Sequence, residues 1–263
     1  MGILCRGTLV LSLTVAASFA LAQGRLISID SARAVSEVNM LTGEKTLLGT
    51  VGSSAGTTGG LAYDRANDVI YLTSTSLDSL FTLDLNTFTA TLLGPYGDST
   101  VVMHGLEYDS STGTLYGVSS HNNGLYRLDK TNGTATLIGT SGLSSFTNLG
   151  YDSANDIMYA TNSGADSFYT MDRSNGATTL IGPLINSTNP NSLAYNSDNG
   201  KLYMADNSTD KLYTMNVATG EAVEVGSMGS GNVLGLMYYN PVPEPATLAI
   251  LGTGLAFLAR RRK

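Results

Sequence analysis

A tyrosine that recurs at nearly equal intervals constrains the fold of this chain more than any other feature. Each member follows a short apolar run, and the steps between successive members are 45, 43, 44 and 43 residues. The members are Tyr63, Tyr108, Tyr151, Tyr195 and Tyr238. Because a fixed period indicates copies of one structural unit, we expect the chain to be a repeat array.

The unit spanning residues 148–182 contains four short runs rich in aromatic and β-branched residues. Clusters of Asp, Asn, Ser and Gly separate them, as is typical of strands joined by hairpin turns. No run has the spacing of an amphipathic helix. Each unit ends in an apolar residue followed by glycine, as in Ile181-Gly182. A period near 44 residues with four strands per repeat predicts an all-β propeller with four-stranded antiparallel blades.

The two ends of the array are incomplete in complementary ways. The first unit, which starts at Arg25, lacks its innermost strand, and the last unit stops after one strand, 234–239. We expect 234–239 to pair with the strand at 25–30 and complete a composite N- and C-terminal blade. This pairing gives a closed ring of five blades and removes the exposed sheet edges of an open array. An open array, or one completed by a second copy, is the alternative.

Residues 1–22 have the three parts of an export signal. Arg6 supplies the positive charge, residues 9–19 the apolar stretch, and Ala20-Leu21-Ala22 a small-residue cleavage site. The only cysteine, Cys5, lies in this segment. The predicted mature domain, 23–240, therefore has neither a disulfide nor thiolate chemistry.

The domain at 23–240 is acidic, with 9 Lys and Arg residues against 20 Asp and Glu. Nucleic acid is an unsuitable partner, because phosphate binding needs clustered basic charge. Many of the carboxylates begin predicted turns, where an Asp or Asn caps local backbone amides. Calcium binding is the alternative, but the spacing of an EF-hand loop is absent. We expect no cofactor and no metal.

Residues 241–263 differ in character from the domain. A proline-rich segment, Pro241-Val242-Pro243-Glu244-Pro245, precedes an uncharged apolar run at 246–259, and Arg260-Arg261-Arg262-Lys263 ends the sequence. The apolar run is shorter than the roughly 20 residues of a stable membrane span. The basic end favours the cytoplasmic side. These features indicate a segment that is inserted transiently in a membrane and then cut.

The sorting motif Val242, Pro243, Glu244 and Pro245, together with the apolar run and the arginine cluster, resembles the PEP-CTERM sorting signal of exopolysaccharide-producing Gram-negative bacteria. The resemblance implies an exosortase-type processing enzyme as a partner. It also implies a cell-surface or extracellular-matrix destination. A plain C-terminal membrane anchor is the alternative. The repeats resemble, more loosely, NHL and YVTN propeller repeats, which supports the fold and assigns no functional residue.

The two faces of the predicted disc differ. If the first strand of each unit is innermost, the nearly uniform turns after the first and third strands share one face. The irregular loops share the other, where we expect recognition, because loops tolerate change. The candidate binding residues there are Tyr96, Met103, His104, His121 and Phe146.

Three residues are weak catalytic candidates. His104 and His121 map to one blade, and with a carboxylate such as Asp98 they could hold a metal or share a proton; two solvated loop histidines are the alternative. Glu107 is the only charged residue inside a predicted inner strand, which makes it a candidate for acid–base chemistry; a salt bridge or exposure at the rim is the alternative. Gly52-Ser53-Ser54-Ala55-Gly56 matches a nucleophile-elbow pattern, but that pattern has meaning only on a strand-to-helix turn.

The leading hypothesis is a non-enzymatic, exported propeller that binds a polysaccharide or a surface protein. An extracellular hydrolase or lyase that uses Glu107, His104 and His121 is the first alternative. A structural protein of the extracellular matrix is the second. The absence of tryptophan leaves tyrosine as the residue for stacking on sugars.

Overall fold

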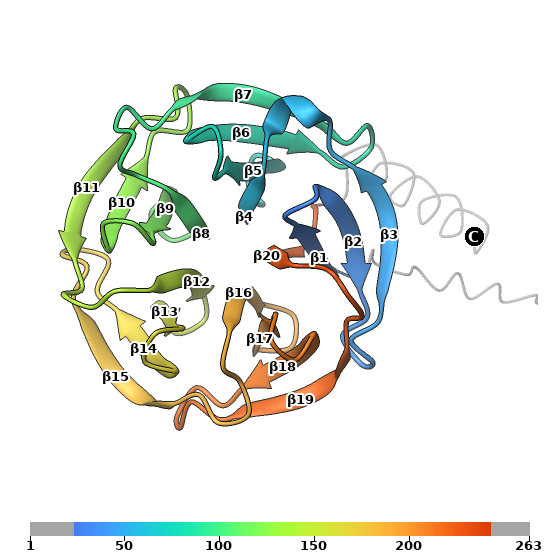
Figure 1. Ribbon diagram of the computed structural model, residues 1–263, viewed down its shortest axis with the longest axis vertical. Helices are drawn as coiled ribbons and strands as arrows, with labels where there is room; N and C mark the ends of the chain where they lie inside the picture. Colours follow the sequence, from blue (N-terminus) through green and yellow to red (C-terminus); the bar gives the residue numbers. More distant parts are fainter. Residues whose placement is uncertain (1–23, 243–263) are drawn as a thin grey trace, which may run out of the picture.

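The structure is a computed structural model that describes residues 24–242. It contains five four-stranded antiparallel sheets arranged as the blades of a ring (Figure 1). Four blades follow the chain from the innermost to the outermost strand: β4 (Thr58–Asp64), β5 (Val69–Ser74), β6 (Ser79–Asp84) and β7 (Thr89–Pro95); β8 (Met103–Asp109), β9 (Thr114–Ser119), β10 (Gly124–Leu128) and β11 (Ala135–Thr140); β12 (Phe146–Asp152), β13 (Ile157–Asn162), β14 (Ser167–Met171) and β15 (Thr178–Pro183); β16 (Pro190–Asn196), β17 (Lys201–Asp206), β18 (Lys211–Met215) and β19 (Ala222–Ser227). The predicted fold is confirmed.

The fifth blade combines the two ends of the described chain. It consists of β20 (Val233–Tyr239), β1 (Arg25–Asp30), β2 (Ala34–Val38) and β3 (Lys45–Thr50), in that order. Leu26 pairs with Tyr238, and Ser28 pairs with Leu236. The predicted closure is therefore confirmed, and each of the five inner strands belongs to a complete four-stranded blade. Both ends of the described chain leave the ring on one face, because β1 begins where β20 ends.

Aspartates at the ends of the inner strands build the turns that follow them. Oδ1 of Asp109 accepts hydrogen bonds from the backbone N–H of Ser111 at 2.8 Å and of Thr112 at 3.2 Å. Asp129 does the same in the turn between the third and fourth strands, where its Oδ1 accepts from the N–H of Thr131 at 2.8 Å. This is the capping chemistry expected of such turns.

Glycine at the end of each outermost strand lets neighbouring blades meet closely. A Cβ at Gly139 would overlap the carbonyl of Asn175, in the last turn of the next blade. Equivalent overlaps occur at Gly94, Gly182 and Gly226. At the fifth junction the ring of Phe88, a residue with a φ of 53°, lies against Gly49. The glycine that closes each repeat is thus explained by contact between blades.

Several inner strands begin earlier than the sequence indicated. Met103 and His104 belong to β8, and Phe146 belongs to β12, where loops were expected. Pairing with the next strand extends this far, because Met103 lies opposite Ser119 and Phe146 lies opposite Asn162. Residues 53–55, inside the stretch at 52–56 that matches the nucleophile-elbow pattern, form a short 3₁₀ turn.

The core lies between blades rather than at the centre of the disc. One cluster joins Val118 and Leu125 of one blade to Leu149 and Met158 of the next. Within residues 24–242, no helix is long and apolar enough to cross a membrane. The predicted signal at 1–22 and the sorting motif from Pro243 onward lie outside the described residues.

Candidate ligand-binding site

A cavity of about 560 Å³ opens at the centre of the face that carries the uniform turns. We call it the cup. Its wall contains the five repeat tyrosines, and its rim contains one residue from each blade, two positions after the tyrosine. The rim residues are Arg65, Ser110, Ser153, Ser197 and Asn240. Its volume is in the range of about 300–1,000 Å³ that is usual for small-molecule sites.

Five leucines close the channel below the cup. They stand two positions before each tyrosine and surround a void of about 10 Å³, room for about one water molecule. They are Leu61, Leu106, Leu149, Leu193 and Leu236. Glycines at this level bring the inner strands together, since a Cβ at Gly105 would overlap the backbone of β12. The cup is therefore open at the face and closed at its floor.

Glu107 is the only carboxylate among the described residues that line the cup. Its Oε1 accepts a hydrogen bond from the backbone N–H of Tyr108 at 2.9 Å, and its Oε2 accepts one from the N–H of Tyr151 at 3.2 Å. Burial raises the pKa of Glu107 to about 8, although the two hydrogen bonds lower it, and nearby Asp109 raises it further. At neutral pH the group is therefore largely protonated.

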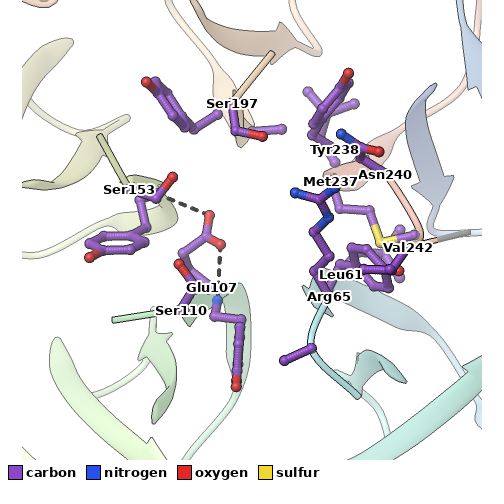
Figure 2. Close-up of a pocket in the computed structure, with 17 residues that line it drawn as sticks. Leu61, Arg65, Glu107, Ser110, Ser153, Ser197, Met237, Tyr238, Asn240 and Val242 are labelled. Atoms are coloured by element: carbon purple, nitrogen blue, oxygen red, sulfur yellow. Dashed lines mark hydrogen bonds between the residues drawn. The ribbon is translucent and has the colours of Figure 1, made fainter. Parts of the chain in front are cut away.

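Arg65 is the only basic residue among the described residues that line the cup. Figure 2 shows its side chain on the opposite side of the cup from Glu107. No ion pair or cation–π contact includes Arg65 within residues 24–242. A cation and a neutral acid therefore share the cup without neutralising each other.

The tyrosine hydroxyls are engaged with aspartates outside the cup. Tyr151 donates to Oδ1 of Asp156 at 2.6 Å, and Tyr238 donates to Oδ2 of Asp198 at 2.7 Å. Burial, followed by the hydrogen bond to Asp156, raises the pKa of Tyr151. The phenols are thus held neutral at physiological pH, and they anchor the wall of the cup to the surrounding turns.

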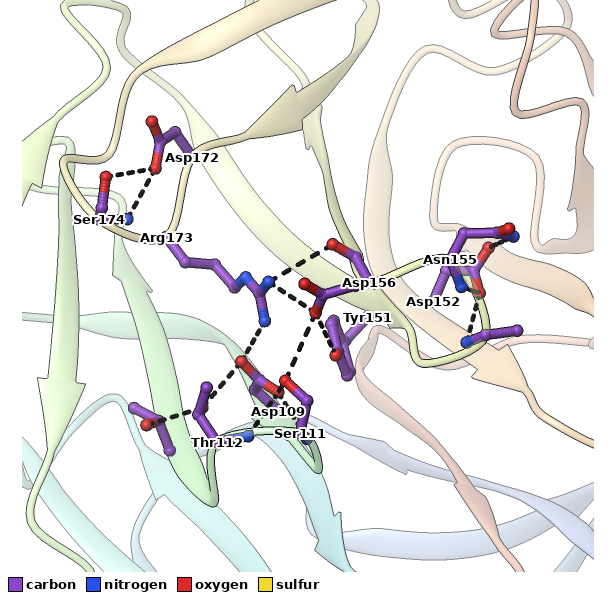
Figure 3. Close-up of polar contacts among 12 residues, drawn as sticks. Asp109, Ser111, Thr112, Tyr151, Asp152, Asn155, Asp156, Asp172, Arg173 and Ser174 are labelled. Carbon is purple, nitrogen blue, oxygen red and sulfur yellow. Dashed lines mark hydrogen bonds and ion pairs between the residues drawn. The ribbon is translucent and has the colours of Figure 1, made fainter.

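A charged joint lies beside the cup, between two blades (Figure 3). Arg173 pairs with Asp109 of the preceding blade and with Asp156 of its own blade, the latter at 2.7 Å. Its guanidinium also lies over the ring of Tyr151, 5.0 Å from the centroid. Burial raises the pKa of Asp109, but hydrogen bonds from Ser111 and Thr112 outweigh it, so the pKa lies below its usual value. This arrangement is a structural link between the two blades.

The two candidate histidines lie on the other side of the leucine floor. Ser120 Oγ is 2.8 Å from His104 Nδ1 and 3.4 Å from His121 Nδ1, so both rings meet one serine. Burial lowers the pKa of His104, and His121 lowers it further. Asp98 bonds instead to Thr100, at 2.8 Å from its N–H. Within residues 24–242, no group of three or more His, Cys, Asp and Glu residues could hold a metal ion.

The structure does not bring the three catalytic candidates together, because Glu107 faces the cup and the histidines face the opposite side. Three of the candidate binding residues are core residues: Tyr96, Met103 and Phe146 are at most 2% exposed. Side chains buried this deeply have no surface to offer a ligand, so their predicted role has no support in the structure. Of the five candidate binding residues, His104 and His121 are the two that remain accessible on the irregular face.

The cup was not predicted from the sequence, in which the tyrosines indicate only the period of the repeats. A signal was present in the departures from the repeat. Position 65 holds arginine where the other copies hold Ser or Asn, and position 107 holds glutamate where the others hold Ala, Gly or Met. Both departures face the same cavity.

Known proteins resemble this chain in two parts, the C-terminal sorting motif and the propeller. Residues 241–263 match the family model of the PEP-CTERM protein-sorting motif. The motif implies export, C-terminal membrane anchoring before processing, and cleavage by an exosortase. Of this motif only Pro241 and Val242 lie within the described residues, and Val242 lines the cup. No curated protein matches the sequence.

Solved structures match the propeller. A chain of a nidogen/laminin complex has a TM-score of 0.61 at 13% identity, and covers 84% of this chain and 100% of its own. A protein of unknown function from Bacteroides thetaiotaomicron has a TM-score of 0.60 at 16% identity, with coverage of 84% and 63%. A chain from work on the evolutionary emergence of a symmetrical protein has a TM-score of 0.55 at 18% identity, with coverage of 84% and 100%. These neighbours confirm the propeller fold and assign no activity.

Proposed function

We propose that this exported propeller is a non-enzymatic binding protein of the cell surface or extracellular matrix, and that its cup takes the end of an extracellular polysaccharide. The observation that carries the proposal is the closed floor of the cup. A blind cavity of about 560 Å³ accepts a chain end of one or two sugar units rather than the middle of a polymer.

The lining of the cup suits a polyhydroxylated ligand. Serine hydroxyls at positions 110, 153 and 197 and the amide of Asn240 lie at the rim, while the half-buried rings of Tyr195 and Tyr238 supply apolar surface. Hydroxyls and amides both donate and accept hydrogen bonds, which matches the mixed character of sugar hydroxyls. Apolar patches between them match the C–H faces of a sugar ring.

The same lining argues against hydrolysis of glycosidic bonds. Hydrolysis of this kind generally uses two carboxyl groups on either side of the bond. Glu107 is the only carboxyl group among the cup residues that the structure describes. We therefore propose binding in preference to the hydrolase or lyase alternative, whose two histidines lie on the other side of the floor.

The test uses the processed protein recovered from the producing cells and the polysaccharide that those cells secrete. Titration calorimetry with that polysaccharide and its short fragments should show binding, and analysis of reducing ends should show no new products. Ser197→Trp fills the rim of the cup and should abolish binding. Ala218→Trp, in an exposed turn on the same face but outside the cup, is the matched control. Absence of binding by the wild-type protein, or formation of products, would overturn the proposal.

A further inference from the structure

The five blades contribute equivalent residues to the cup, and a charged residue replaces an uncharged one at two of these positions. At the rim, four blades present Ser or Asn, and the blade of β4 presents Arg65. One level below, the blade of β8 presents Glu107, where its counterparts are Ala62, Gly150, Ala194 and Met237. In a repeat array, the residues that all copies share are the ones that form the fold. Departures that converge on one open cavity therefore point to a ligand.

The fold by itself does not need either residue. The backbone N–H of Tyr151 is bonded by Glu107, but at the four equivalent places the inner strand has no carboxylate beside it. Those four blades close equally well. Arg65 is exposed and takes part in none of the ion pairs of residues 24–242, whereas Lys130 and Arg173 serve the joints between blades.

We infer that the cup binds a carboxylate of its ligand, held between the guanidinium of Arg65 and the carboxylic acid group of Glu107, so that the ligand is an acidic saccharide end of the uronic acid class. The inference deepens the proposed function and rests on it. Arginine binds carboxylates through two parallel N–H donors. A neutral acid whose oxygens already accept two backbone N–H groups has its own proton free to donate toward the cup.

The charges around Glu107 are consistent with an anionic ligand. On its own strand, Asp109 is paired with Arg173 rather than facing the cup, and Tyr108 is a neutral phenol; on the neighbouring strand β12, Tyr151 is also a neutral phenol. On the inner strands that complete the wall, the lining residues are uncharged, and Arg65 faces Glu107 across the cavity. No aspartate lines the cup among the described residues. A bound carboxylate thus meets one positive charge and no negative one at neutral pH.

The experiment compares two probes that differ only at the carboxyl group: a disaccharide with terminal glucuronic acid, and the same disaccharide with that carboxyl reduced to an alcohol. The processed wild-type protein should bind the acid about tenfold or more tightly than the alcohol, the usual scale of a charge-assisted pair of hydrogen bonds. Arg65→Gln should remove this preference by weakening binding of the acid at least tenfold more than binding of the alcohol. Lys201→Gln removes a positive charge from the same face without touching the cup and should have no effect.

A pH series separates Glu107 from general electrostatics. Affinity for the acid should fall as pH rises through about 8, because Glu107 ionises and repels the ligand. In Glu107→Gln, whose amide also donates to a carboxylate, the fall should disappear. Equal binding of both probes, or a preference unaffected by Arg65→Gln, would overturn this inference and leave the proposed function standing. Failure of both probes and of the polysaccharide to bind would overturn the proposed function itself.

Discussion

The backbone N–H of Tyr151 donates a hydrogen bond of 3.2 Å to Oε2 of Glu107, which belongs to the neighbouring blade. The bond ties two inner strands together at the wall of the cup. It also fixes the position of the only carboxyl group among the cup residues described. The side chain that links two neighbouring blades is therefore also the acid group of the cup.

The raised pKa of Glu107 predicts a specific pH dependence of stability. The folded protein holds this proton up to about pH 8, while the unfolded chain releases it near 4.5, so the stabilising effect is complete below pH 4.5 and is lost as pH rises toward 8. The slope approaches about 1.4 kcal/mol per pH unit in that interval. Glu107→Gln should remove this slope, as measured by urea unfolding at pH 5 and 8.

The lowered pKa of His104 has the opposite effect on the free energy of unfolding. At mildly acidic pH it makes the protein more stable as pH rises, because the folded state disfavours the charged imidazole. The relevant quantity is therefore the difference between the unfolding free energies of the wild type and Glu107→Gln at each pH. Glu221→Gln, an exposed site away from the cup, serves as the control. A pH-independent difference between wild type and Glu107→Gln would contradict the raised pKa.

Gly139→Ala should destabilise the ring by about 1–3 kcal/mol, because the new methyl group overlaps the carbonyl of Asn175 and separates two blades. Gly52→Ala is the matched control. Its Cβ would meet nothing closer than Ser54 Oγ at 3.8 Å, and its φ of −55° suits alanine. The control should change the free energy of unfolding by less than about 0.5 kcal/mol. Equal effects of the two substitutions would refute the close approach of blades at Gly139.

Arg173→Met should leave Asp109 as a buried charge without its cation, at a cost of about 3 kcal/mol. Lys130→Met should cost less than this, because Lys130 is more exposed than Arg173 and lies 3.6 Å from Asp64, although Asp64 is itself buried. Adding Asp109→Asn to Arg173→Met should restore part of the loss, since the amide oxygen keeps the turn hydrogen bonds. Thermal and urea unfolding measure all three. A loss that Asp109→Asn does not relieve would assign the effect to packing on Tyr151 instead.

Truncation after Asn232 removes β20 and leaves the inner edge of β1 unpaired. An open sheet edge recruits other chains, so the truncated protein should associate and lose cooperative unfolding. Size-exclusion chromatography with light scattering gives the mass, and circular dichroism follows unfolding. A truncated protein that stays monomeric and unfolds like the wild type would contradict closure by β20.

Membrane anchoring before processing should restrict access to the cup. Val242 lines the cup, and only residues 243–245 separate it from the apolar run that begins at Ala246. A chain this short spans at most about 14 Å. If the proposed function holds, unprocessed protein in membranes should bind a disaccharide but not the intact polymer, while processed protein binds both. A (Gly-Ser)₅ insertion after Pro245 should restore polymer binding; equal binding by both forms would exclude this restriction.

Much of this architecture was predictable because each blade is a local unit. The period of the tyrosines set the number of blades, and the incomplete units at Arg25 and at 234–239 predicted the composite blade. The starts of inner strands were less predictable. Loops and strand ends share the same composition, so the assignments of Met103, His104 and Phe146 to loops were wrong. Their burial in the core depends on neighbouring blades that the local sequence does not reveal.

The sequence alone predicted the repeat, the closure of the ring, and the export and sorting signals, because each depends on the pattern of short segments that can be compared along the chain. The tertiary structure alone placed the cavity on the face with the uniform turns, set Arg65 opposite Glu107, and made Glu107 a neutral acid. These properties arise where five inner strands, distant in the chain, converge, because burial, and with it the pKa of a carboxyl group, depends on what surrounds it in space.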